Sequence, residues 1–168
     1  PILIASGHRR IAMVGGTDAT STGRERERGW REAMEAAGLE ASAELRIKGP
    51  RDRHSGFDAA AAVLAVPDRP TAIACFSDLV ALGLMYGLSR EGLRPGVDIA
   101  VTGYDDVDEA AIAMPSLTTV ANGQSEVGRR AADCLAARLS GAPAVEAVEL
   151  ITPELKIRQS SACRPGGA

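Results

Sequence analysis

Continuous apolar runs alternate with longer segments of helical spacing from Ile11 to Thr102. The runs at 11–14, 72–75 and 99–102 are apolar almost throughout, which is typical of strands buried on both faces of a parallel sheet. The helices that we predict around these runs span residues 22–37, 55–66 and 77–91. Each of these segments is followed by glycine or proline, where helices commonly end. The alternation predicts an α/β fold, an open parallel sheet with helices on both faces.

The strand–helix–strand unit at 71–106 lies at the centre of this pattern. A unit of this length joins parallel strands by a right-handed crossover, so both strands end at the same edge of the sheet. Phe76 and Ser77 follow the first of these strands, and Asp105 and Asp106 follow the second. Because ligands of open α/β sheets bind at this carboxyl edge, we expect a binding site there.

The segments that flank this unit have shorter patterns. Alternation of polar and apolar residues at 43–48 predicts a half-exposed strand. Residues 108–114 are predicted as a short helix that ends before Pro115, and 117–121 as an extended segment.

The last part of the chain reads as one helix and two extended segments. The helix spans 125–139. Its predicted inward side chains are Val127, Ala131, Leu135 and Leu139. Residues 145–151 and 155–158 are predicted to be extended, and the tail after Ser160 to be disordered.

Composition and charge limit the classes of protein to which this chain can belong. A chain of 168 residues with 45% hydrophobic residues can bury one sizeable core, and its net charge of −3 argues against a nucleic-acid or membrane surface. Cys75, Cys134 and Cys163 form no CxxC pair, which indicates free thiols in a reducing compartment. The opening PILIAS is too short for a signal peptide or a membrane span. We therefore expect a soluble cytoplasmic protein that has no membrane partner.

Several segments, taken in order, match one known pattern. They are GHRRIAMVGG, the RERGW that follows it, FSDLVALGLMYGLSREGLRPGVDIAVTGYDD with PSLTTV after it, and LITPELKIRQS. Together they resemble the effector-binding domain of LacI/GalR-type (lactose-repressor-like) transcriptional regulators. Each motif alone is weak, but together they cover the chain from Gly7 to Ser160.

The resemblance implies a periplasmic-binding-protein-like fold with two lobes. Residues 7–120 would form the C-terminal lobe, and 121–152 would be a return segment of a second, largely absent N-terminal lobe. Residues 153–160 would be a strand that returns to the C-terminal lobe, and 161–168 a disordered tail. The DNA-binding helix-turn-helix of the family has no counterpart in this sequence.

The implied function is binding of a small sugar-like or other polar effector, which would control DNA binding allosterically in the intact regulator. Operator DNA would be contacted only through the helix-turn-helix. A periplasmic-type solute-binding receptor for sugar transport is the alternative, and it would need a secretion signal. A flavodoxin-like enzyme is disfavoured, because the glycine loop at 15–23 lacks the lysine and spacing of a P-loop and neither His8 nor His54 has metal-ligand spacing. We therefore expect no enzyme activity, no cofactor and no metal.

The resemblance also implies ligand contacts at Arg26 and Asp105. A guanidinium presents paired donors in one plane, and a carboxylate can accept two hydroxyls of a sugar-like ligand. Arg26 could instead be one of several charges on a solvated helix face, since Arg24 and Arg28 flank it. For Asp105 the alternative is a turn or capping residue, and we expect capping from Asp106 or Asp108 instead.

Four further residues are candidate ligand contacts. Phe76 and Ser77 follow the middle strand, where many relatives carry asparagine in place of Ser77. Ser77 is at least equally suited to cap the following helix. Thr20 and Thr22 could offer hydroxyls, or they could be ordinary polar loop residues.

The helix at 77–91 is apolar nearly all round, so one of its faces should meet a partner chain. Members of the family pair through this lobe, and we expect a homodimer. The predicted interface residues are Leu79, Leu82, Met85, Tyr86, Ala110 and Met114.

Overall fold

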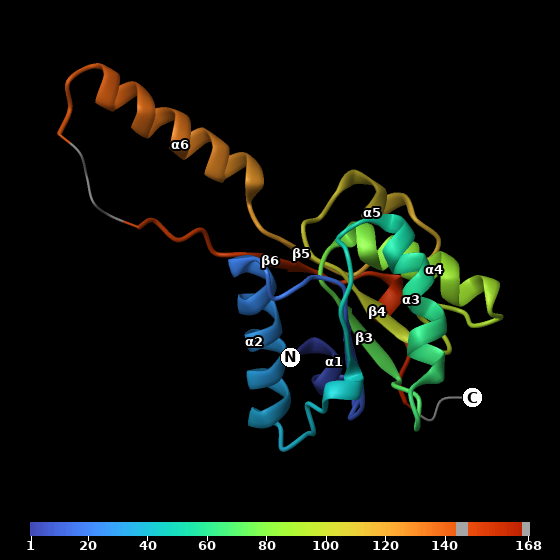
Figure 1. Ribbon diagram of the computed structural model, residues 1–168. Helices are drawn as coiled ribbons and strands as arrows, with labels where there is room; N and C mark the ends of the chain where they lie inside the picture. Colours follow the sequence, from blue (N-terminus) through green and yellow to red (C-terminus); the bar gives the residue numbers. More distant parts are fainter. Residues whose placement is uncertain (144–147, 166–168) are drawn as a thin grey trace.

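The computed structural model describes residues 1–143 and 148–165. A parallel sheet lies between helices on its two faces (Figure 1). Its strands are β1 (Ile11–Val14), β2 (Arg46–Ile47), β3 (Ala72–Cys75) and β4 (Ala100–Thr102). They pair in the order β2-β1-β3-β4, and every neighbouring pair is parallel. The predicted fold class, an open parallel sheet with helices on both faces, is confirmed.

The helices come from the segments with helical spacing. Helix α2 (Ser21–Ala36) covers one face of the sheet, and α3 (Arg53–Ala65) and α4 (Asp78–Arg90) pack together on the other (Figure 1). The α3–α4 contact brings backbone against backbone, because a Cβ at Gly83 would lie 2.0 Å from the carbonyl oxygen of Arg53. The small and apolar residues of α4 therefore serve close packing within the chain.

The parallel sheet and the helices packed on it form the main body of the molecule, and a second, two-stranded sheet extends from it. Strand β5 (Thr119–Ala121) pairs antiparallel with β6 (Glu154–Lys156), and α6 (Gln124–Leu139) extends away from the rest of the molecule (Figure 1). The prediction that Val127, Ala131, Leu135 and Leu139 face inward is wrong, because no residue of α6 is buried. The helix is amphipathic, but no other element of the described chain covers its apolar face.

The segment predicted as a strand at 43–48 is mostly a turn. Residues Ala43–Leu45 form a 3-10 helix (η1), and only Arg46–Ile47 join the sheet. The alternation treated Arg46 as solvent-facing, whereas its side chain is 3% exposed and its Nε lies 2.9 Å from Glu27 Oε2 on α2. Arg46 therefore looks like an exposed polar position in the sequence, although in the fold it is buried in an ion pair with Glu27.

Two other boundaries differ from the predicted ones. Helix α5 (Asp108–Ile112) ends before Met114, and its N-cap is Val107, so the expected side-chain capping by Asp106 or Asp108 is wrong. Of the extended segment predicted at 145–151, residues 145–147 lie outside the described part of the chain, and 148–151 belong to no strand.

The tail predicted to be disordered is ordered as far as Pro165. Gln159–Ser161 form a 3-10 helix (η2), and the Ser161 hydroxyl lies 2.7 Å from the hydroxyl of Thr118. The carbonyl oxygen of Cys163 accepts a hydrogen bond from Nε2 of His8 at 3.1 Å. Small polar residues gave no sequence signal for order, because they are fixed by hydrogen bonds rather than by apolar burial. Residues 166–168 lie outside the described part.

The N-terminal residues also belong to the body. Helix α1 (Ile2–Ala5) places Leu3 in the core with β1 and with Trp30 and Met34 of α2. The imidazole of His8 is buried beside it and joins Thr71 and the tail. His8 is therefore structural, as its place outside any metal spacing suggested.

Candidate functional site

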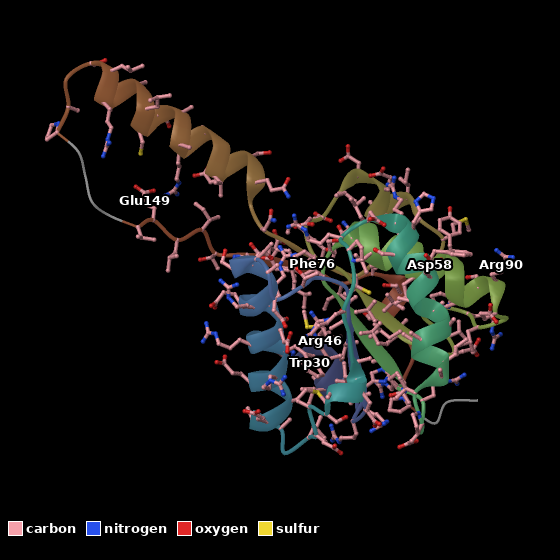
Figure 2. All side chains as sticks on the ribbon, viewed as in Figure 1. Trp30, Arg46, Asp58, Phe76, Arg90 and Glu149 are labelled. Atoms are coloured by element: carbon pink, nitrogen blue, oxygen red, sulfur yellow. The ribbon has the colours of Figure 1, made fainter. Side chains whose placement is uncertain are left out.

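The carboxyl edge of the sheet gathers the candidate ligand residues. Strand β1 is followed by Gly15 and Gly16, β3 by Phe76, and β4 by the turn at 103–106. Figure 2 shows Phe76 at this edge, near the end of α2. The edge that sequence reasoning selected is therefore the one at which these side chains meet.

Arg26 projects from α2 into this edge. Its guanidinium lies between two aromatic rings, 4.4 Å from the centroid of Phe76 and 3.8 Å from that of Tyr104. Nη1 donates to the carbonyl oxygen of Phe76, and Nη2 lies 3.5 Å from Oδ1 of Asp105. The rings and the carbonyl fix the plane of the guanidinium, so Arg26 is a positioned donor rather than one charge on a solvated helix face.

Asp105 presents its carboxylate from a left-handed backbone conformation, with φ 122°. Its backbone nitrogen donates to the carbonyl oxygen of Val120 at 2.9 Å, and its Oδ1 accepts from Nδ2 of Asn122 at 3.1 Å. Burial raises the pKa of the Asp105 carboxyl, and the nearby charge of Arg26 opposes that rise. The side chain is 24% exposed, so part of it remains accessible to solvent.

Phe76 supports Arg26 and is itself 3% exposed. Its ring packs on the backbone of Gly16, where an added Cβ would lie 2.4 Å from Cδ2 of the ring. The φ of Gly16 is +74°, a conformation that also favours glycine. The structure therefore gives Phe76 a supporting position beneath the guanidinium.

Of the three candidates that carry a hydroxyl, Ser77 and Thr20 cap helices and Thr22 is exposed. The Ser77 hydroxyl accepts from the backbone nitrogen of Val80 at 3.4 Å, and the residue is 5% exposed, so its N-cap reading is the one observed. Thr20 caps α2 in the same way, accepting from the nitrogen of Gly23 at 3.1 Å. Thr22 is exposed on the first turn of α2. None of the three side chains is hydrogen-bonded to Arg26 or Asp105.

Two residues at the site were missed by sequence reasoning. Tyr104 covers one face of the Arg26 guanidinium, and Asn122 binds Asp105. Oδ1 of Asn122 is buried with no hydrogen-bond partner. Tyr104 lies inside the GYDD motif and could have been selected on that ground. Asn122 follows β5, and only the fold brings it next to Asp105.

A buried carboxylate lies directly beneath the site. Asp78, the first residue of α4, is fully buried. Its Oδ1 accepts from the hydroxyl of Thr119 at 2.5 Å, and its Oδ2 accepts from the nitrogen of Val107 at 2.9 Å. Burial is the largest cause of the raised pKa of Asp78. Asp78 thereby joins α4 to β5 and to the turn that carries Asp105.

The predicted dimer residues lie on or beside one groove between α4 and α5. A cavity of about 670 Å³ is lined by Leu82, Met85, Tyr86, Ile112 and Met114. Tyr86 is 73% exposed and Met114 is 96% exposed. Leu82 and Met85 form the floor of the groove and are nearly buried, Leu79 is partly exposed, and Ala110 is fully buried within the chain.

Two features are absent from the described residues, 1–143 and 148–165. No group of three or more histidine, cysteine, aspartate or glutamate side chains in that part could hold a metal ion. No helix there is long and apolar enough to span a membrane.

Comparison with known proteins gives the family. The profile of the periplasmic binding protein-like domain matches residues 2–161. The chain is 36% identical over 157 residues to the HTH-type transcriptional repressor PurR of Photobacterium profundum, covering 94% of this chain and 47% of that protein. The chain therefore spans about half the length of the curated relatives that it matches.

Two solved structures extend this likeness. A complex of the transcriptional regulator CelR with cellobiose superposes with a TM-score of 0.87 at 36% identity, over 95% of this chain and 49% of that one. The lac repressor dimer bound to operator and the anti-inducer ONPF gives a TM-score of 0.87 at 30% identity, over 96% of this chain and 56% of that one. The chain belongs to the periplasmic binding protein-like domain family, in the form found in LacI/GalR-type transcriptional regulators.

Proposed function

We propose that this chain is the effector-binding and dimerisation portion of a LacI/GalR-like transcriptional regulator. Its ligand would be a small polar metabolite, and occupation of the site would control the binding of operator DNA by a longer protein. Relatives of this chain are described as transcriptional repressors, and one related structure is a cellobiose complex. A regulator of transcription works beside the chromosome, so a cytoplasmic location forms part of this proposal.

The observation that carries the proposal is the pairing of Arg26 with Asp105 at the carboxyl edge. The guanidinium is held between two rings, and the carboxylate opposite it is 24% exposed. One supplies fixed donors and the other supplies acceptors, which is what recognition of a ligand with several hydroxyls requires. Thr20, Thr22, Phe76 and Ser77 would then shape and cap the site rather than supply its main contacts.

The arrangement of β5, α6 and β6 supports the two-lobe part of the proposal. Both strands leave the body beside the candidate site, and the α6 helix between them has an uncovered apolar face. We propose that residues 121–152 belong to a second lobe, and that 7–120 and 153–160 form the lobe described here. A ligand held between two lobes would favour their closed arrangement and could shift DNA affinity by that difference.

The groove between α4 and α5 supports a homodimer. Tyr86 and Met114 expose apolar surface on either side of a floor made by Leu82 and Met85. Leu79 lies on the same helix and is partly exposed, whereas Ala110 would act by holding α5 in place. Exposed apolar surface of this kind commonly marks an interface, and two-fold pairing is the commonest solution.

The proposal is tested on the full-length product of the native gene. Its binding to DNA from its own upstream region is measured by fluorescence anisotropy, alone and with a panel of polar metabolites. We expect at least one metabolite to change DNA affinity in the wild type and to have no such effect in Arg26→Gln. Arg24→Gln is the matched control and should respond as the wild type does. Absence of DNA binding, or an unchanged response in Arg26→Gln, would contradict the proposal.

A further inference from the structure

A second arginine lies at the rim of the candidate site. Arg51 is exposed in the loop between β2 and α3, next to Asp52, the N-cap of α3. Its guanidinium carbon is 5.7 Å from the centroid of the Phe76 ring, the same ring that supports Arg26 at 4.4 Å. Two guanidinium groups thus lie within reach of one ring, and one of them faces solvent.

Arg51 differs from the other cations of this edge in having no partner. Nζ of Lys48 lies 2.5 Å from Oδ2 of Asp18, and Nη2 of Arg53 lies 2.7 Å from Oε1 of Glu109. Within the described part of the chain, no protein group accepts a hydrogen bond from Arg51. The neighbouring Asp52 carboxylate is occupied as a helix cap, accepting from the nitrogen of Ser55 at 2.8 Å.

The charge balance of the site follows from these contacts. Arg26 pairs directly with Asp105, and Arg51 acts on the same carboxyl only through its charge, so one positive charge at the rim has no directly paired carboxylate. The first turns of α2 and α3 begin at the same edge and add the positive ends of two helix dipoles, whereas Asp78 lies on the first turn of α4. A neutral polyol would leave this charge without a partner when the site closes and water is excluded.

We propose that Arg51 selects an effector that carries an anionic group, a phosphate or a carboxylate, on a polar body. The anion binds Arg51 at the rim, while hydroxyl groups of the same molecule bind Asp105 and Arg26. A guanidinium suits this role because its planar fork matches two oxygens of either anion. The inference rests on the proposed function and narrows the class of ligand.

The test uses inorganic phosphate and acetate as probes. The arginine Nε–Hε signals of the ¹⁵N-labelled chain are followed by NMR while phosphate or acetate replaces chloride at constant ionic strength. We expect the Arg51 signal to move and saturate with at least one of the two anions, and glucose to leave it unchanged. In the variant Arg51→Gln, binding of that anion, followed on the Arg26 signal, should weaken by about five- to tenfold, the loss expected for one charged hydrogen bond at a partly solvated position.

Arg24→Gln provides the matched control. Arg24 lies at the same edge and donates to the backbone oxygen of Asp18 at 2.7 Å, so its loss changes the local charge equally. It should leave anion binding within about twofold of the wild type, because it acts only through screened charge. Equal weakening in both variants, or an Arg51 signal that moves in step with those of the remote Arg9 and Arg69, would overturn the inference. Because this readout needs neither DNA nor the native effector, it can fail while the regulator proposal stands.

Discussion

The guanidinium of Arg158 lies 2.7 Å from the carboxylate of Asp106, with Nη2 donating to Oδ1. This pair joins the end of β6 to the turn that carries Asp105. On the other side of the turn, Asn122 donates to Asp105 from the end of β5. Both strands that leave the body are therefore attached to the turn that presents the proposed ligand acceptor.

Replacement of Arg158 by glutamine should lower stability. The two side chains are only 20% and 22% exposed, and Nη1 of Arg158 also donates to the carbonyl oxygen of Leu117 at 2.9 Å. We expect the free energy of unfolding to fall by about 1–3 kcal/mol, because a half-buried carboxylate loses its partner. Urea unfolding followed by the fluorescence of Trp30 measures this change. Arg94→Gln breaks a pair whose arginine is 72% exposed and whose Asp98 is 26% exposed, and it should lower the free energy of unfolding by about 1 kcal/mol or less. Equal losses in the two variants would argue against a special role for the Arg158 contact.

Gly16→Ala should displace the ring of Phe76, which supports the guanidinium of Arg26. The new Cβ would lie 2.4 Å from Phe76, and the φ of +74° is unfavourable for alanine. We expect a loss of about 1–3 kcal/mol, measured by thermal unfolding. Gly29→Ala is the control, because Gly29 lies inside α2 with nothing within 4 Å of the added atom. It should leave stability unchanged or raise it by up to about 1 kcal/mol. A Gly16→Ala protein as stable as the wild type would show that the ring can move freely.

Asp78 should give stability an unusual dependence on pH. Burial raises its folded-state pKa above the ordinary value of 3.8, so the folded chain holds this proton more tightly than the unfolded chain does. The contribution of Asp78 to the free energy of unfolding therefore increases as pH falls from the raised folded-state pKa toward 3.8. A salt-bridged aspartate, whose folded-state pKa is lowered, behaves in the opposite way. Relative to Asp78→Asn, the wild type should become more stable between about pH 7 and about pH 4. Urea unfolding of both proteins across this range measures the difference, and a constant or opposite difference would contradict the assignment.

The sheet and the position of Asp105 at its carboxyl edge could be predicted from strong signals in the pattern, whereas Arg26 was selected through the family resemblance. Continuous apolar runs give the buried strands, and parallel strands bring their carboxyl ends to one edge. The role of Ser77 as an N-cap was also open to sequence reasoning, because serine before a helical segment has that local function. What the sequence pattern described well was thus either periodic or local.

The features that escaped prediction depend on contacts between distant polar residues. Arg46 looks exposed until Glu27 is brought beside it, and the tail looks disordered until Thr118 and His8 bind it. Asn122 has no motif that marks it as a neighbour of Asp105. Hydrogen bonds of this kind have no sequence period, so only the folded chain reveals them.

Tyr86→Glu should separate the proposed dimer into monomers. Tyr86 lines the groove between α4 and α5 and is 73% exposed, so glutamate there remains solvated in the monomer and should change its stability by no more than about 0.5 kcal/mol. In a dimer built on this groove the same charge would be buried without a partner. We expect the dissociation constant, measured by analytical ultracentrifugation, to rise by about two orders of magnitude, the effect of losing an aromatic anchor.

The choice of residue decides what this experiment can show. Met85 lies in the same groove, but it is only 5% exposed, so glutamate at that position would unfold the monomer and mimic dissociation. Leu135→Glu supplies the control, because Leu135 is 60% exposed on α6, the other apolar surface on which copies could associate. A dimer built on the α4–α5 groove should survive Leu135→Glu and be lost in Tyr86→Glu. The opposite result would assign self-association to the uncovered face of α6 and would remove the groove from the proposed interface.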